Sequence, residues 1–261
     1  TDPFGYLTRL RELIGPDTWL IVEKILAADE PLDPPLDIHG TTGYDALREF
    51  DGVFVNANAA GALGELAREY SGSTWDADAV AAAEWELKAR IANEELAPEV
   101  RRLARSVRRD NQATSPATSD VTDAELTEVL VALVARMPVY RADYRCLSRV
   151  TPTLIAQLAE LGHNPAALDL TAAALATSGE AAHRFAQVCG AVMAKGVEDT
   201  LFYRACRLVA LQEVGGAPGR TGVSQAEFHL LQAERAALWP RTMTALTTHD
   251  TKRSEDTRAR M

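Results

Sequence analysis

The sequence predicts a mainly α-helical protein in which a few strands and helices of an α/β scaffold flank a large helical insertion. Alanine and leucine recur throughout the 261 residues, and both residues favour helix. Helix and strand patterns alternate in the first quarter of the chain, which is typical of a parallel α/β unit. From residue 57 onward, alanine-rich and amphipathic helical patterns replace that alternation.

The composition is that of an ordinary globular protein and limits the kinds of partner. Apolar residues make up 47% of the chain and charged residues 25%. The formal net charge of -10 argues against a nucleic-acid backbone or an anionic membrane as the main partner. A neutral ligand fits this balance better. No apolar run approaches the length of about 18 residues that a membrane span needs.

Cysteine usage predicts a reducing compartment. Cys146, Cys189 and Cys206 form no CxxC pair and are too few for a disulfide framework. We therefore expect reduced thiols in a cytoplasmic protein. The sequence starts at Thr1 without an initiator methionine or a signal peptide. This start leaves open that the chain is an excised piece of a longer protein.

Helix and strand signals alternate in the first 56 residues. Asp2-Pro3 is typical of an N-cap followed by proline in the first helical turn. A run that is apolar on both faces, TWLIVE, is typical of a buried parallel strand. The expected elements are a helix over residues 3–14, a strand over 18–23, a helix over 46–50 and a second strand over 51–56.

The remainder of the chain is expected to be helical until close to its end. Thr122 and Glu125 have the spacing of a capping box, and so do Ser224 and Glu227. Residues 241–248 form a third strand-like segment. A closed (β/α)₈ barrel has eight strands, so we expect an incomplete (β/α)₈ barrel at the two ends. Further helices are expected near residues 123–137, 152–161, 166–176, 180–194 and 198–211.

Two acidic positions stand at the ends of predicted strands. Glu23 closes the first strand, and Asp250 follows His249 at the end of the third. Paired carboxylates at strand ends are what glycoside hydrolysis and glycosyl transfer require. Two structural alternatives remain open. Glu23 could be a strand-end glutamate that Lys24 neutralises, and Asp250 could cap a helix that begins near Lys252.

A third candidate lies at the junction between two predicted helices. Lys195, Tyr203 and Arg204 offer hydrogen-bond donors that could contact sugar hydroxyls. The structural alternative is a plain helix junction in which Gly196 caps the first helix. Both roles are compatible with the sequence.

No metal or cofactor is indicated by the sequence. His39 and His229 each stand alone, and we interpret them as structural histidines or ligand contacts. The chain contains no HExxH motif and no Cys/His cluster.

Four stretches carry a resemblance to a known family. They are TWLIVEKIL, GTTGYDALREFDGVFVN, VMAKGVEDTLFYRACRLVALQEVGG and LTTHDTKRSEDTRARM. These stretches closely resemble the maltooligosyltrehalose synthases, which belong to the α-amylase family (glycoside hydrolase family 13). They span nearly the whole chain in the expected order, and the region from about residue 57 to 180 matches more loosely.

The resemblance implies an intramolecular transglycosylation. The reducing-end α-1,4 linkage of a maltooligosaccharide would become an α,α-1,1 linkage by a retaining double displacement, as a step of trehalose biosynthesis. The product would pass to a maltooligosyltrehalose trehalohydrolase. Two other functions remain open: an α-1,4-glucan hydrolase of the same family, and a non-catalytic helical module that binds glucan or a partner protein.

The resemblance also implies roles for individual residues. Glu23 matches the acid/base, while His249 and Asp250 match the pair that holds the distorted sugar, with Asp250 counted as catalytic. In the family the nucleophilic aspartate precedes a segment like residues 1–7, so we expect a fragment that is inactive alone. Asp2 is no substitute, because it precedes a proline at a helix start. Together with the donors considered above, the candidate substrate-binding residues are Lys195, Glu198, Tyr203, Arg204, Lys252, Tyr44 and His249.

The expected organisation has three parts. Residues 1–56 form a partial barrel segment with the acid/base, and residues 57–195 form the helical insertion. Residues 196–261 hold substrate-contacting helices and return to the barrel with the His-Asp pair.

Overall fold

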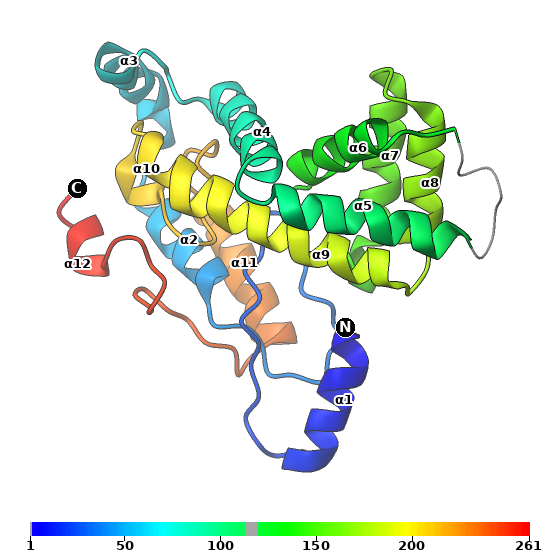
Figure 1. Cartoon of the computed structure of the whole chain (residues 1–261). Helices are drawn as coiled ribbons and strands as arrows, with labels where there is room; N and C mark the ends of the chain where they lie inside the picture. The colour runs from blue at the N-terminus through cyan, green and yellow to red at the C-terminus, as the bar shows by residue number, and fades with distance from the viewer. Residues whose placement is uncertain (1, 113–119) are drawn as a thin grey trace. The chain divides into compact units, whose positions relative to one another are not determined.

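The computed structural model describes residues 2–112 and 120–261 and is mainly α (Figure 1). About 61% of the chain is helical, and no strand is formed in the described residues. The chain folds as two compact units. We call Thr1–Ala81 with Phe202–Met261 the terminal unit, and Ala82–Leu201 the helical unit. The three-part division that we expect from the sequence stays a prediction.

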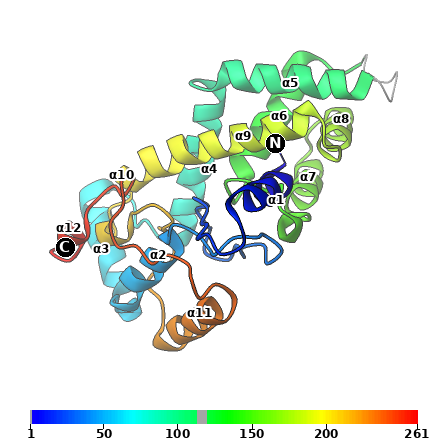
Figure 2. The same cartoon turned by 90° about the horizontal axis from the view of Figure 1, so that it is seen from below.

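The helical unit packs its helices around a leucine-rich core. α5 contacts α6, α8 and α9. Figure 1 shows α5 beside α9, and Figure 2 shows the same helices from below. Leu103, Leu126, Leu130, Leu133 and Leu158 are fully buried. The helices of this unit are α4 (Ala77–Asn93), which begins in the terminal unit, α5 (Ala97–Gln112), α6 (Asp123–Arg136), α7 (Val150–Glu160), α8 (Pro165–Leu175) and α9 (Glu180–Met193).

Local capping signals explain where these helices begin. At the start of α6 the Glu125 N–H donates to Thr122 Oγ1 (3.2 Å), and the Thr122 N–H donates to Glu125 Oε2 (2.8 Å). The predicted capping box is therefore confirmed. Asn164 caps α8, and Pro165 occupies its first turn.

A π-helical segment, η4 (Ala194–Leu201), directly follows α9. The expected cap at Gly196 is therefore wrong, because Gly196 lies inside this segment and is buried. Close packing against Lys88 explains why residue 196 is a glycine, because a Cβ at this position would lie only 3.0 Å from Lys88 Cγ. π-Helical turns occur frequently at functional sites.

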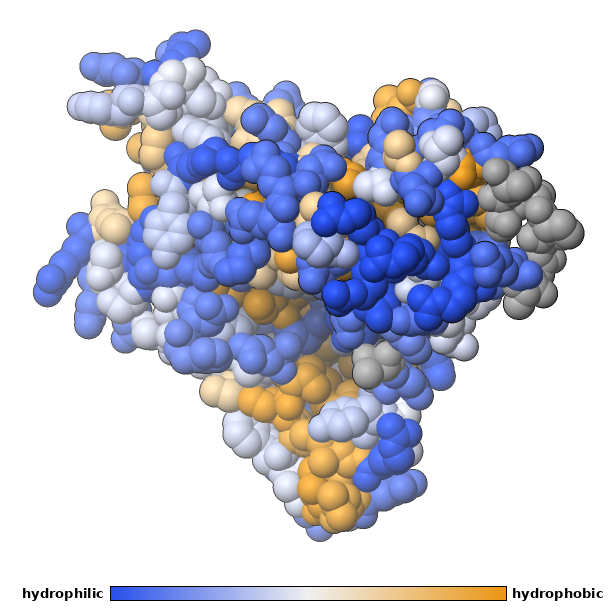
Figure 3. All heavy atoms as spheres, viewed as in Figure 1, coloured by the Kyte–Doolittle hydropathy of each residue, from blue (hydrophilic) through white to orange (hydrophobic). Residues whose placement is uncertain are grey.

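The terminal unit combines helices with long irregular segments. The helix expected over residues 3–14 is confirmed as α1 (Pro3–Ile14), with Pro3 in its first turn. Apolar side chains gather on the surface at the bottom of the view in Figure 3, where Figure 1 places α1. On α1 itself, Leu13 is 82% exposed. The other helices of the terminal unit are α2 (Tyr44–Val53), α3 (Ala60–Ser71), α10 (Phe202–Arg204), α11 (Gln225–Leu238) and α12 (Glu255–Arg258), with short 3₁₀ turns at Ala57–Ala59 and Val209–Leu211. The 3₁₀ turn at Arg145–Leu147 belongs to the helical unit.

The first predicted strand is an extended segment with a parallel partner. Val22 and Thr41 form an isolated parallel bridge. The Val22 N–H donates to Gly40 O (3.0 Å), and the Thr42 N–H donates to Val22 O (3.2 Å). On the other side, the Met243 N–H donates to Thr41 O (3.3 Å). Three extended segments therefore lie side by side, but the pairing is too short to form strands in the described residues.

The strand predicted over residues 51–56 is wrong. Residues 51–53 form the last turn of α2, and Phe54 is 88% exposed. The Val53-Phe54-Val55 run suggested a buried strand, but a short apolar run does not distinguish a strand from a helix end. A tertiary contact favours the helix end in this protein: the Val223 N–H donates to Gly52 O in the last turn of α2 (2.9 Å).

The third predicted strand is not formed either. Residues 241–248 are irregular, and the helix expected to reach residue 211 ends at Arg204. The barrel elements expected at the two ends are thus not seen in the described part of the chain. None of the helices described is long and apolar enough to cross a membrane.

Shortening a core leucine should destabilise the helical unit. Leu130→Ala removes a fully buried side chain of α6, and the cavity should lower the free energy of unfolding by about 2–5 kcal/mol. Urea denaturation followed by circular dichroism measures this change. Leu161→Ala is the matched control, because Leu161 is 61% exposed. An equal effect of both substitutions would contradict the assignment of the core.

Two cysteines should differ in reactivity. Burial raises the pKa of the Cys189 thiol to about 12, whereas Cys146 is exposed. Only the thiolate is nucleophilic, so iodoacetamide at about pH 8 should alkylate Cys146 and spare Cys189 in the folded protein. Peptide mass spectrometry reads out both sites, with urea-unfolded protein as the control. Equal labelling of the two in the folded state would contradict this prediction.

Candidate functional site

Glu23 and His249 lie close together in the terminal unit. Glu23 follows the bridge residue Val22, and its Oε1 lies 3.6 Å from Nε2 of His249. The two side chains are 49% and 77% exposed, so both are open to solvent. The fold thus brings Glu23, the predicted acid/base, next to His249 from the other end of the chain.

Lys24, the neighbour of Glu23, is turned into the interior. Its ammonium group pairs with Glu30, and both side chains are buried. The second oxygen of Glu30 accepts a hydrogen bond from the Ala27 N–H (3.0 Å). Because buried charges need a close partner, Glu30 balances the charge of Lys24.

The turn that carries His249 and Asp250 is tied by its threonines. The Asp250 N–H donates to Thr248 Oγ1 (3.2 Å), and Thr251 Oγ1 donates to Thr248 O (3.0 Å). The carboxylate of Asp250 lies 3.4 Å from Nζ of Lys252. The alternative in which Asp250 caps a helix near Lys252 is wrong, because α12 begins later and has Ser254 at its N-cap.

Tyr44 supports this turn from α2. Its side chain is buried, with 1% of the residue exposed. Its hydroxyl lies 2.8 Å from Thr248 Oγ1, within hydrogen-bond distance. Gly43, at φ 91°, precedes α2, and a Cβ there would meet Met243 O at 2.7 Å. Only glycine allows this close approach of the two backbones.

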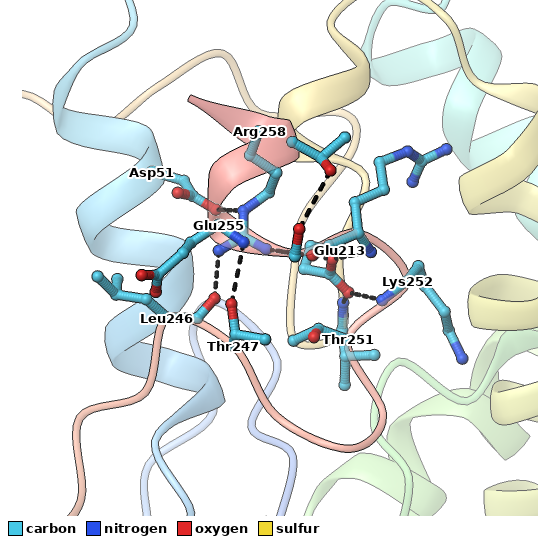
Figure 4. Close-up of polar contacts among 12 residues, drawn as sticks. Asp51, Glu213, Leu246, Thr247, Thr251, Lys252, Glu255 and Arg258 are labelled. Atoms are coloured by element: carbon cyan, nitrogen blue, oxygen red, sulfur yellow. Dashed lines mark hydrogen bonds and ion pairs between the residues drawn. The ribbon is translucent and has the colours of Figure 1, made fainter. Parts of the chain in front are cut away.

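A buried network that the sequence reasoning missed lies beneath the turn (Figure 4). Glu213, at 1% exposed, accepts hydrogen bonds from the backbone N–H groups of Lys252 and Arg253. Arg258, at 6% exposed, lies between Glu213 and Asp51. Burial raises the pKa of the Asp51 carboxyl, and the adjacent Arg258 opposes that shift. In the sequence, Glu213 was seen only as part of the stretch VMAKGVEDTLFYRACRLVALQEVGG, which carries the family resemblance but indicates no partner for this carboxylate.

Four further predicted residues lie on η4 and α10. Lys195 and Glu198 lie on η4 in the helical unit. Lys195 pairs with Asp199 (2.7 Å), and the buried Glu198 accepts a hydrogen bond from the Tyr140 hydroxyl. Tyr203 and Arg204 are exposed on α10, in the terminal unit. The guanidinium of Arg253 lies 5.3 Å from the centre of the Tyr203 ring.

The two histidines that stand alone in the sequence have neighbours in the terminal unit. His39 Nδ1 accepts a hydrogen bond from the Leu20 N–H (3.0 Å), which helps to join two of the extended segments. The His229 ring packs edge-on against Phe228. Among the described residues, no group of three or more His, Cys, Asp or Glu side chains could hold a metal ion.

Known proteins resemble the chain along its whole length. No protein-family model matches it. Putative maltooligosyl trehalose synthases from two strains of Mycobacterium tuberculosis are 46% identical over 262 residues, which is 100% of this chain and 33% of theirs. The chain therefore spans about one third of the length of these curated relatives.

Solved structures agree in fold. Maltooligosyltrehalose synthase from Arthrobacter ramosus matches with a TM-score of 0.83 and 40% identity, over 99% of this chain and 32% of that one. A hypothetical maltooligosyl trehalose synthase from Sulfolobus tokodaii matches with a TM-score of 0.75 and 26% identity, over 99% and 32%. The resemblance found in the sequence is confirmed, and the chain is a homologue of the maltooligosyltrehalose synthases that corresponds to one third of their length.

Proposed function

We propose that this chain supplies the acid/base and the sugar-holding residues of a maltooligosyltrehalose synthase. The reaction would convert the reducing-end α-1,4 linkage of a maltooligosaccharide into an α,α-1,1 linkage. The observation that carries the proposal is the approach of Glu23 Oε1 to His249 Nε2 at 3.6 Å. It places a solvent-accessible carboxyl beside the turn that bears Asp250.

Glu23 would transfer protons in both halves of a retaining double displacement. It would first protonate the oxygen of the departing glucose and then, as a base, deprotonate the 1-hydroxyl of that glucose for its attack on the glycosyl-enzyme. Its side chain is half-exposed, so a bound sugar could reach it. Holding the released glucose away from water is what separates such a mutase from a hydrolase.

Asp250 and His249 would hold the distorted sugar in the transition state. The Asp250 carboxyl lies 3.4 Å from Nζ of Lys252, so Asp250 and Lys252 would contact the sugar together. Tyr44 would act through Thr248, to which its hydroxyl is hydrogen-bonded. The nucleophilic aspartate would be supplied from outside these 261 residues, because no aspartate in the chain matches the family pattern for it.

The other substrate contacts would come from η4 and α10. Tyr203 presents an exposed ring that could stack on a sugar face, and Arg204 lies next to it. Lys195 and Glu198 lie on the π-helical segment, a conformation that often marks a functional site.

The terminal unit would be part of a (β/α)₈ barrel. The parallel bridge between Val22 and Thr41 supports this view, because parallel pairing is the pattern of such barrels. The exposed apolar side chains of Leu13 and Phe54 also support it. In a barrel, helix faces of this kind pack against neighbouring strands and helices.

Replacing the proposed acid/base should abolish activity. In a full-length synthase that carries this segment, Glu23→Gln should lower both transfer and hydrolysis by about 10²–10⁴-fold, because the amide cannot exchange a proton. Product formation from maltopentaose, followed by chromatography, measures the loss. Glu12→Gln on α1 is the control, since Glu12 is exposed. Near-normal product formation by the Glu23 variant would exclude this role.

The linkage of the product distinguishes a mutase from a hydrolase. The same full-length protein, incubated with maltopentaose, should form a non-reducing product of unchanged mass. A reducing-sugar assay combined with mass spectrometry detects it. Release of glucose and maltotetraose would instead indicate a hydrolase. The 261-residue chain alone should give neither product, and turnover by it would contradict an external nucleophile.

A further inference from the structure

The turn with His249 and Asp250 belongs to an irregular loop, residues 246–253, which we call the 246–253 loop. It lies between the last extended segment and α12, and none of its residues is helical. Most of it is partly or fully exposed. Hydrogen bonds among Thr248, Asp250 and Thr251 tie the turn itself, so the groups beneath the loop are what hold its two ends on the terminal unit.

One buried carboxylate holds two consecutive peptide groups of this loop. Glu213 Oε1 accepts from the Lys252 N–H at 2.6 Å, and Glu213 Oε2 accepts from the Arg253 N–H at 2.8 Å. Hydrogen bonds to an ionised acceptor are stronger than neutral ones. With one oxygen on each N–H group, the carboxylate fixes the orientation of both peptide planes.

One buried guanidinium closes the base of the same loop. Arg258 Nη1 donates to Arg253 O (2.5 Å), and Nη2 donates to Leu246 O. These two carbonyls are the two ends of the loop. Figure 4 shows the Arg258 side chain reaching from α12 toward Leu246, Asp51 and Glu213.

The two buried charges depend on one another. Arg258 Nη1 lies 3.4 Å from Glu213 Oε2, and Arg258 Nε lies 2.9 Å from Asp51 Oδ2. A buried charge that loses its partner is costly. Glu213, Arg258 and Asp51 therefore form one charged cluster, and the geometry of the loop depends on it.

We propose that Glu213, paired with Arg258, is a positioning residue that sets the place of Asp250 and His249 relative to Glu23. Glu213 does not touch the reacting sugar and acts only through the backbone of Lys252 and Arg253. The Lys252 side chain carries the effect onward, because its Nζ lies 3.4 Å from Asp250 Oδ1. This inference rests on the proposed function, since it concerns the same site.

The test begins with Glu213→Gln, which keeps the size of the side chain but removes its charge and one acceptor. In the 261-residue chain, amide hydrogen exchange of peptides covering the 246–253 loop should speed up by about tenfold or more, because one N–H loses its acceptor. Peptides from α5 and α6 in the helical unit should exchange as before. Unchanged exchange in the loop would overturn the proposal.

The kinetic arm uses a full-length synthase that carries the segment. Glu213→Gln should lower kcat by about 10²-fold, the cost of a misplaced catalytic group, while KM changes little. A residue that only stabilised the fold would lower the melting temperature and leave the kcat of the folded enzyme unchanged. That result would also overturn the proposal.

Glu227→Gln is the matched control. Glu227 pairs with Arg220 at 3.0 Å, as Glu213 pairs with an arginine, but its side chain is 38% exposed. Its substitution should leave loop exchange and kcat within about twofold, because exposed ion pairs contribute little. A control that lost activity like Glu213→Gln would overturn the specific role of Glu213.

Glu213→Asp covers the case in which the glutamine variant does not fold. Aspartate keeps the negative charge beside Arg258, but it is one methylene shorter and cannot reach both N–H groups. It should fold, with faster exchange in the 246–253 loop and a lower kcat; wild-type values for both would overturn the proposal. If the wild-type synthase made no non-reducing product, the proposed function would fail, while the exchange experiment would still report on the anchoring by Glu213.

Discussion

The contact between the buried carboxylate of Glu213 and the buried guanidinium of Arg258 holds the 246–253 loop of the terminal unit in place. Strands would normally satisfy the backbone groups of such segments, but none is formed in the described residues. Here ionised side chains take over that task. Glu213 accepts from Lys252 and Arg253, and Arg258 donates to Leu246 and Arg253. Loss of Arg258 would remove the guanidinium that both Glu213 and Asp51 contact in the interior.

The two units achieve order in different ways, and this difference decided what could be predicted. In the helical unit, the signals are local: the capping box at Thr122 and Glu125 and the apolar spacing of α6 were sufficient to place a helix. In the terminal unit, the contacts join residues far apart in the chain, such as Val22 with Thr41 and Thr41 with Met243. Sequence patterns indicate which segments are extended, but they do not indicate which segments pair.

The candidate site shows the same division. Glu23 and the His249-Asp250 pair could be selected from the sequence, because carboxylates at the ends of apolar segments and the family resemblance both point to them. The approach of Glu23 to His249 could not be derived, since it depends on the pairing of three extended segments. Glu213 was missed because its acceptor role involves backbone N–H groups, which any residue type provides. The strand predicted at residues 51–56 was wrong for a similar reason. The Val53-Phe54-Val55 run suggested a strand, whereas the contact of the nearby Asp51 with Arg258, close to the other end of the chain, could not be seen in the sequence.

The ion pair between Lys24 and Glu30 has a consequence for the direction of the neighbouring side chain. Successive side chains of an extended segment point to opposite faces, so the burial of Lys24 directs Glu23 outward, where it is half-exposed. A slip of one residue in the pairing with residues 39–42 would exchange the two faces. Glu23 would then be buried and Lys24 exposed. The interior salt bridge thus fixes the register of this segment: as long as Lys24 is paired with Glu30 in the interior, Glu23 points to the exposed face.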